Sequence, residues 1–316
     1  MSTTRGTAAV SLIGLTKYYG SRRGVEQVTF DVAPGEVVGF LGPNGAGKTT
    51  TMRMLVGLLR ITRGQAVVLG VDIARAPPGL RARIGYLPGA LALYSNLTGR
   101  QFLTFAARMR GLAVSGRIDG LAERLDLDLD RHIHDLSKGN RQKVGVIQAF
   151  LHEPDVLILD EPTSGLDPLV QREFEGMVDE ATARGAAILL SSHVLSEVDH
   201  LADRVAIVNQ GRLVVVQSVE GLRQGALRTI ELAFSRPVDT AALAMIEGAT
   251  GVIQAVAHGS LVTCTVRGSE HDLLRVAVDC GVDFVRSRDP GLDEIFLSLV
   301  AGGDGNAGAP ADQDVA

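Results

Sequence analysis

The chain has 316 residues, of which 46% are hydrophobic and 21% are charged. These proportions are typical of a soluble globular protein, and the length allows one large domain and a small one with well-buried cores. The net charge of −5 argues against an extended nucleic-acid surface, so we expect no nucleic-acid partner. No uninterrupted apolar run approaches the roughly 18 residues of a membrane span, so we do not expect the chain to cross a bilayer by itself.

The first 20 residues contain one arginine and a mixed segment, without the basic start and small-residue cleavage site of a signal peptide. We therefore expect a first edge strand there. Cys264 and Cys280 have no C-x-x-C spacing, which favours structural thiols in a reducing cytosol over metal binding or thiol catalysis.

Two short apolar-rich segments, 8–16 and 25–32, predict strands joined by a loop at 18–24. Tyr19 on this loop could stack on an adenine ring, although a surface or packing role is commoner for a lone tyrosine.

The most specific motif follows an apolar run at 36–41 and precedes a helical pattern at 52–59. It matches G-x-x-x-x-G-K-[ST], in which backbone N–H groups surround a polyphosphate, Lys48 reaches its outer oxygens and Thr49 ligates magnesium. The helix that begins here adds its positive end to the same site. We expect the following residues to bind a nucleotide: Gly42, Pro43, Asn44, Gly45, Ala46, Gly47, Lys48, Thr49 and Thr50.

Further strands are predicted at 65–71 and 83–89, and from Thr98 to about Leu125 apolar residues at three-and-four spacing predict an α-helical insert. After the insert, Ser137 is a plausible N-cap of a helix that runs to about residue 151. By itself, this serine indicates a cap and nothing more.

A continuous apolar run at 155–159 ends in Asp160 and Glu161 and predicts a buried parallel strand. Open α/β sheets bind ligands at the carboxyl ends of such strands. Asp160 can hold magnesium through its water shell, and Glu161 can take a proton from an attacking water. A solvated strand end is the alternative, and the phosphate loop upstream argues against it.

A later buried strand delivers His193 to the same sheet edge, where it could contact the terminal phosphate, although a lone histidine is more often structural. Before His193, we predict a turn at 164–168, a helix at 169–184 and this strand at 186–191, and after it a hairpin at 204–216. We expect the nucleotide domain, residues 1–220, to end after this hairpin.

These segments together resemble, in order and over about residues 10–220, the nucleotide-binding subunit of ABC transporters. The resemblance implies an ABC-type α/β P-loop ATPase fold with an antiparallel β subdomain and a helical subdomain at about 90–150. It implies ATP and Mg²⁺ as ligands, Glu161 as general base, His193 as phosphate sensor and Thr49 and Asp160 as metal ligands. By this resemblance, Tyr19 matches the family's adenine-stacking tyrosine and Asp167 lies in its D-loop. The signature segment contains Ser137, Lys138, Gly139 and Asn140.

The resemblance further implies a head-to-tail dimer, expected to be a homodimer, in which each ATP lies between the phosphate loop of one protomer and the signature segment of the other. Hydrolysis would then reopen the dimer.

Two positions depart from the family pattern. Gly89 stands where the family usually has Gln or Glu, and we hypothesise that a water or a partner residue replaces that side chain. The signature reads Leu-Ser-Lys-Gly-Asn in place of Leu-Ser-Gly-Gly-Gln, and Lys138 could lie near the phosphates or be solvated. The Lys-containing form is similar to that of the export branch, which includes drug and polysaccharide exporters.

Residues 227–287 follow a β-α-β-β-α-β order, which predicts a small ferredoxin-like α+β domain within 221–300. Residues 290–296 resemble the Pro-x-Leu-acid-acid-x-Phe ending of drug-exporter ATPase subunits, and this segment could pack on its own domain or contact a partner. The Gly-, Ala- and Asp-rich segment 301–316 predicts a disordered tail.

The leading hypothesis is therefore an ATPase, peripheral at the cytoplasmic face of the cell membrane, that powers export through a separately encoded membrane permease. One alternative is a soluble family member serving translation or cofactor assembly, although ribosome-acting members usually carry two such domains and a basic linker. The other is a non-hydrolysing, nucleotide-gated binding module, which Gly89 favours and the intact Asp160, Glu161 and His193 oppose.

Overall fold

A computed structural model describes residues 8–112, 116–192, 194–225, 227–288 and 295. The chain divides into two compact units, residues 1–216 and 217–316, whereas the sequence analysis placed the boundary near residue 220. Each unit is described by itself.

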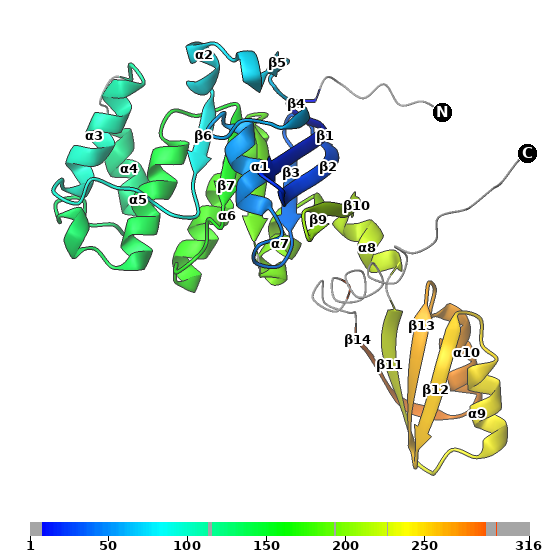
Figure 1. Ribbon diagram of the computed structural model, residues 1–316. Helices are drawn as coiled ribbons and strands as arrows, with labels where there is room; N and C mark the ends of the chain where they lie inside the picture. Colours follow the sequence, from blue (N-terminus) through cyan, green and yellow to red (C-terminus); the bar gives the residue numbers. More distant parts are fainter. Residues whose placement is uncertain (1–7, 113–115, 193, 226, 289–294, 296–316) are drawn as a thin grey trace, which may run out of the picture. The chain divides into compact units, whose positions relative to one another are not determined.

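The first unit is built on a ten-stranded sheet with the order β5-β4-β1-β2-β10-β9-β3-β8-β7-β6 (Figure 1). Its strands are β1 (Val10–Tyr19), β2 (Arg22–Val32), β3 (Val37–Leu41), β4 (Arg63–Val68), β5 (Val71–Asp72), β6 (Ile84–Leu87), β7 (Val156–Asp160), β8 (Ala187–Ser192), β9 (Arg204–Asn209) and β10 (Arg212–Ser218).

The centre of this sheet is parallel, because β9, β3, β8, β7 and β6 pair in that order with parallel registers. Every residue of β3, β7 and β8 is buried, which explains why these strands appear as continuous apolar runs in the sequence. At the other side, β5, β4, β1 and β2 pair antiparallel. Parallel registers bring the carboxyl ends of β3, β7 and β8 to one edge of the sheet.

Helices α3, α4 and α5 form a separate cluster beside β6, at the end of the sheet (Figure 1). A capping box at Thr98 and Gln101 starts α3, and the buried side chains of Leu103, Leu125 and Ile147 lie in this part of the chain. The helices of the first unit are α1 (Lys48–Leu55), η1 (Ile73–Arg75), α2 (Pro78–Arg81), α3 (Gly99–Met109), α4 (Arg117–Arg124), η2 (Ile133–Asp135), α5 (Lys138–Phe150), α6 (Pro168–Ala183) and α7 (Leu195–Leu201).

The structure contains the α-helical insert predicted from Thr98 to about Leu125, in the form of α3 and α4. Helix α3 ends at Met109, because Gly111 adopts φ 72° and the chain leaves the helix there. One local prediction was wrong. Tyr19 is the last residue of β1, and a two-residue turn through Gly20 at φ 60° replaces the longer loop expected at 18–24.

The second unit contains α8 (Val219–Gly225) and a four-stranded sheet with the order β12-β13-β11-β14. The strands pair antiparallel, and Ile230, Leu232 and Cys264 belong to one buried apolar cluster with Leu273 of α10. This β-α-β-β-α-β order is the one predicted from the sequence. Its elements are β11 (Leu227–Phe234), α9 (Thr240–Glu247), β12 (Val252–His258), β13 (Leu261–Arg267), α10 (His271–Asp279) and β14 (Val282–Arg288).

Three predictions fall on residues that the structure does not describe: His193, the tail at 301–316 and, apart from the buried Ile295, the segment 290–296. Within the residues that are described, no helix combines the length and the apolar character needed to cross a membrane.

Candidate active site

The phosphate loop joins the buried strand β3 to helix α1. Gly45 has φ 83° and Gly47, the residue before the helix, has φ 106°, a conformation that side chains rarely adopt. A Cβ on Gly47 would lie 2.2 Å from Val25 Cγ1, so the loop can pass under β2 only with a glycine there. The first N–H groups of α1 are left without helical partners and make this turn an anion-binding site.

Lys48 begins α1 and is held against its own loop. Its side chain is buried, and the ammonium donates to the carbonyls of Gly42 at 2.5 Å and Pro43 at 3.4 Å. Burial lowers the pKa of Lys48, while the nearby charges of Glu161 and Asp160 oppose that shift. The cation is therefore positioned by the backbone before any ligand arrives.

Asp160 links three elements at the carboxyl edge of the sheet. Its carboxylate is buried and accepts hydrogen bonds from the Thr49 hydroxyl at 2.7 Å and the Ser191 hydroxyl at 2.6 Å. The parallel register of β7 and β8 pairs Asp160 with Ser191, which explains the second contact. A hydroxyl and a carboxylate side by side are oxygen ligands of the kind that Mg²⁺ prefers, so these residues fit the expected metal. The sequence analysis did not identify Ser191 as a site residue, although its place at a strand end was a signal.

Glu161 follows in a left-handed backbone conformation with φ 52°, and its backbone is fixed on both sides. Its N–H donates to the Ser191 hydroxyl at 3.1 Å, and its carbonyl accepts from the Gln142 side chain at 3.0 Å. The same Gln142 amide donates to the Pro162 carbonyl at 2.9 Å. This fixed turn places Glu161 in the wall of the cavity above the phosphate loop. Gln142 was not predicted, because its contact depends on the packing of α5 against this turn.

The cavity above the phosphate loop has a volume of about 460 Å³. Tyr19, with 49% of its surface exposed, forms part of the wall, and Lys17 Nζ lies 5.3 Å from the centre of its ring. The structure thus brings Tyr19 together with the phosphate loop. Arg22 and Arg23 also line the cavity, and the sequence analysis did not single them out.

The signature residues lie at the start of α5 and do not line this cavity. Ser137 caps the helix, since its hydroxyl accepts from the Asn140 N–H at 3.1 Å, and Lys138 donates to the Ser164 hydroxyl at 3.2 Å. A Cβ on Gly139 would lie 2.4 Å from the carbonyl oxygen of Gly165, so the helix start packs closely on the following turn.

Asp167 caps α6 and accepts from the N–H groups of Leu169 at 3.1 Å and Val170 at 3.0 Å. The hydrogen bond from Val170 is the main cause that lowers the pKa of Asp167. Gly89 lies against the Asp160 carboxylate, because a Cβ there would be 3.0 Å from Asp160 Oδ2. The position that usually carries Gln or Glu thus faces Asp160 directly.

A second and larger cavity, of about 670 Å³, lies between α3 and the sheet. Its walls are mostly apolar and include the exposed side chains of Tyr94, Phe105 and Met109. Arg53 and Arg110 also line it, and in the described part of the chain neither guanidinium forms an ion pair with a carboxylate.

Comparisons with known proteins agree with this geometry. Residues 25–164 match the model of the ABC transporter family. The chain is 33% identical to the bacitracin transport ATP-binding protein BcrA of Bacillus licheniformis over 92% of its length and 96% of that protein. It is 34% identical to the daunorubicin resistance ATP-binding protein DrrA2 of Streptomyces coeruleorubidus over 92% and 94%, respectively.

Solved structures resemble the first unit's fold. An ATP-binding subunit of an ABC transporter matches with a TM-score of 0.65 and 34% identity, covering 69% of this chain and 92% of that one. The dimeric bacterial cassette MJ0796 matches in fold with a TM-score of 0.62 at 19% identity, covering 66% and 98%. The predicted fold class is confirmed by these matches.

Proposed function

The chain belongs to the ATP-binding subunits of the ABC transporter family, and on this premise we propose that it powers export through a separately encoded membrane permease. The proposed cargo is a drug, an antibiotic, or a lipid- or polysaccharide-like molecule. Relatives named for bacitracin transport and daunorubicin resistance, matched over almost their whole length, support this substrate class and direction. The chain would work as a peripheral protein at the cytoplasmic face of the membrane.

One observation carries the chemistry: Lys48, Thr49, Asp160 and Glu161 meet at a single sheet edge around the phosphate loop. We propose that Lys48 and the loop Gly42 to Thr50, through the backbone N–H groups of its residues other than Pro43, bind the ATP phosphates, and that Tyr19 stacks on the adenine. Glu161 would accept a proton from the attacking water, and His193 would contact the terminal phosphate.

Thr49 and Asp160 would hold magnesium, which when bound with ATP neutralises charge on the phosphates. Ser191 keeps the Asp160 carboxylate oriented through its 2.6 Å hydrogen bond. The 2.7 Å contact between the Thr49 hydroxyl and the Asp160 carboxylate supports this assignment, because it places side by side two oxygen groups of the kind that Mg²⁺ prefers.

A second nucleotide-binding subunit, expected to be another copy, would complete each site. Ser137, Lys138, Gly139 and Asn140 form the start of a 13-residue helix with no acidic residue in its first turn, so its positive end is not neutralised locally. We propose that this end contacts the ATP held by the other protomer, with Asp167 in the adjoining D-loop.

The cavity beside α3 is the surface we propose for the permease. Exposed Tyr94, Phe105 and Met109 offer an apolar seat for an amphipathic segment. Arg53 and Arg110 at the same cavity favour a segment that carries an acidic side chain, because such a carboxylate would meet two cations without carboxylate partners in the described residues.

The proposal is tested by purifying the tagged full-length chain from native membranes in mild detergent, with Glu161→Gln trapped in ATP. We expect a multispan membrane protein to co-purify, and ATP turnover of the wild type to be lost in Glu161→Gln. The matched control is Asp155→Asn, which removes a carboxylate next to the opposite end of β7 and should hydrolyse ATP normally. Recovery of ribosomes or other soluble partners alone, with the chain absent from membranes, would overturn the exporter assignment.

A further inference from the structure

The nucleotide cavity is built from two parts of the sheet that meet at a narrow seam. Tyr19 and Arg22 belong to the antiparallel part, β1 and β2, whereas the phosphate loop follows the parallel strand β3. Among the described residues, β2 and β10 pair in register at one position only, Glu26 opposite Arg212. The distance between the Tyr19 ring and the phosphate loop therefore depends on how firmly this seam is fixed.

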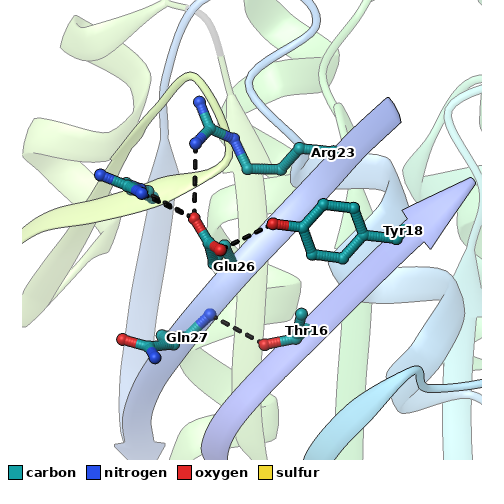
Figure 2. A network of polar contacts seen from close by, with 6 residues as sticks. Thr16, Tyr18, Arg23, Glu26 and Gln27 are labelled. Atoms are coloured by element: carbon teal, nitrogen blue, oxygen red, sulfur yellow. Dashed lines mark hydrogen bonds and ion pairs between the residues drawn. The ribbon is translucent and has the colours of Figure 1, made fainter. Parts of the chain in front are cut away.

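The Glu26 carboxylate accepts hydrogen bonds from side chains of three strands, as Figure 2 shows. The Tyr18 hydroxyl of β1 donates to Oε1 at 2.7 Å, and Arg23 Nη1 of β2 lies 3.4 Å from Oε2. Arg212 of β10 donates to Oε2 through Nε at 3.0 Å and Nη2 at 2.8 Å. The hydrogen bond from Tyr18, followed by that from Arg212, lowers the pKa of Glu26 to about 2, so the carboxylate is ionised at neutral pH.

A bulge in β2 places Glu26 at this junction. Leu15 pairs with Val28 and Lys17 pairs with Val25, so β2 contains one more residue than β1 in this interval. The extra length is taken up at Gln27, which has φ 52° and donates its N–H to the buried Thr16 hydroxyl at 3.0 Å (Figure 2). The bulge takes Glu26 out of the β1–β2 ladder and leaves its backbone N–H for another partner.

That partner connects Glu26 to the phosphate loop. The Glu26 N–H donates to the Gly211 carbonyl at 2.7 Å, and the Gly211 N–H donates to the Ala46 carbonyl at 3.1 Å. The same segment of β2 touches the loop directly, because a Cβ on Gly47 would lie 2.9 Å from the Gly24 carbonyl oxygen. A continuous chain of hydrogen bonds thus runs from Tyr18, the neighbour of Tyr19, through Glu26 to the phosphate loop.

Gly24 gives this segment a second contact with the ring of Tyr19. A Cβ on Gly24 would lie 2.9 Å from Tyr19 Cε2, so the aromatic ring rests on the backbone two residues before Glu26. Any movement of Glu26 along the seam would therefore be transmitted to the ring as well as to the loop.

We propose that Glu26 is a positioning residue that sets the spacing between the Tyr19 ring and the phosphate loop, and so selects nucleoside triphosphates over bare polyphosphate. This inference rests on the proposed function, in which Tyr19 receives the base. Removal of the Glu26 charge frees the ring side of the cavity to shift relative to the loop, while Lys48 and the loop backbone keep their own contacts.

The test compares the affinity of the full-length chain for Mg-ATP with that for magnesium tripolyphosphate by titration calorimetry. Aromatic stacking contributes roughly 1–3 kcal/mol per base, which is about a 5- to 150-fold change in affinity. We expect Tyr19→Ala to lower the affinity for ATP by a factor within this range. Glu26→Gln should lower the affinity for ATP by about tenfold, which lies inside the same range. Both variants should bind tripolyphosphate as the wild type does, and Glu26→Gln should raise KM for ATP without lowering kcat.

Asp155→Asn is the matched control, because it removes a carboxylate from another arginine pair, with Arg83 at 2.7 Å, away from the cavity. It should change neither affinity. Tyr18→Phe removes one hydrogen-bond donor to Glu26 and tests the same network if Glu26→Gln fails to fold. It should lower the affinity for ATP but not that for tripolyphosphate, and by a smaller factor than Glu26→Gln.

If Glu26→Gln lowers the affinities for ATP and for tripolyphosphate equally, Glu26 only stabilises the phosphate loop and does not set its distance from the Tyr19 ring. If the affinity for ATP is unchanged, Glu26 has no role in nucleotide binding. If Tyr19→Ala leaves the preference for ATP intact, the assignment of Tyr19 in the proposed function is wrong. If Tyr19→Ala lowers this preference and the Glu26 and Tyr18 variants do not, the Glu26 inference alone is overturned.

Discussion

His152 provides a test of how a partly buried, neutral imidazole supports Arg110 in the wall of the α3 cavity. Its Nε2 lies 2.9 Å from Arg110 Nη1 and 3.2 Å from the Ile84 carbonyl. An arginine cannot accept a hydrogen bond, so Nε2 accepts from Arg110 and does not also donate to the Ile84 carbonyl, which instead accepts from Arg110 Nη1 at 3.4 Å. Burial, reinforced by the charge of Arg110, lowers the pKa of His152 from 6.5 to about 4. The imidazole is therefore neutral in the folded protein at neutral pH and holds Arg110 in place.

The sign of the pH dependence follows from that pKa. The unfolded chain takes up a proton at His152 below pH 6.5, whereas the folded chain does so only near pH 4. The stability is complete above pH 6.5 and is lost as the pH falls from 6.5 towards 4. At about 1.4 kcal/mol per pH unit, this histidine alone removes about 2 kcal/mol between pH 8 and pH 5. For a unit of this size, that loss lowers the Tm by roughly 4–8 °C.

The assay is calorimetric unfolding of the wild type and His152→Gln at intervals from pH 8 to pH 5. Glutamine keeps a hydrogen-bonding side chain of similar length and cannot be protonated, so the Tm of the variant should fall less with acid than that of the wild type. The exposed His200→Gln, which removes an imidazole outside the core, should follow the wild type. Parallel pH profiles for the wild type and His152→Gln would refute the reasoning.

Three further predictions concern other parts of the chain. Gly89→Gln places a side chain next to Asp160 and should raise steady-state ATP turnover by up to about tenfold, equivalent to ~1.4 kcal/mol of activation free energy. If neither the turnover nor its magnesium dependence changes, the missing side chain at Gly89 does not limit catalysis. Gly139→Ala should lower the free energy of unfolding by about 1–3 kcal/mol, because the new Cβ would meet the Gly165 carbonyl. The same variant should form no ATP-dependent dimers in gel filtration, and dimerisation of the variant at the wild-type level would contradict this prediction. The pKa of Asp272 is lowered to about 2, mainly by a hydrogen bond from a backbone N–H, so its carboxylate stabilises the second unit above pH 4. The amide-exchange protection of the second unit should therefore fall less between pH 4 and pH 2 in Asp272→Asn than in the wild type. Identical acid profiles of the two proteins would argue against this role of Asp272.

The phosphate loop could be predicted from the sequence because its determinants are local. Gly45 and Gly47 have positive φ angles that few other residues tolerate, and Lys48 bonds to carbonyls five and six residues away. The buried strand that ends at Asp160 was recognisable for a similar reason, since the four consecutive buried residues before this aspartate leave a continuous apolar run. Short-range constraints of this kind appear directly in the order of residues.

The contacts that complete the site are long-range and were not predictable. Thr49 and Asp160 are 111 residues apart in the sequence, and Glu26 and Arg212 are 186 apart. The bulge at Gln27 leaves a three-residue spacing between the buried Val25 and Val28 where alternation requires two, and the sequence analysis did not use this break. Motif spacing locates the residues that bind a ligand, but the residues that hold them at the right distance depend on which strands become neighbours.

The position of the signature residues explains why one chain is expected to be insufficient for the full reaction. Ser137 and Lys138 are exposed at the start of α5, outside the cavity that the phosphate loop lines. Among the described residues, the Ser137 hydroxyl accepts only from the Asn140 N–H. A helix end with a cation and without an acidic residue in its first turn is stabilised by an anion from outside. The ATP of a second protomer is an anion of this kind. Because ATP would then be bound by groups of both chains, we infer that hydrolysis weakens the contact between protomers without requiring a further switch.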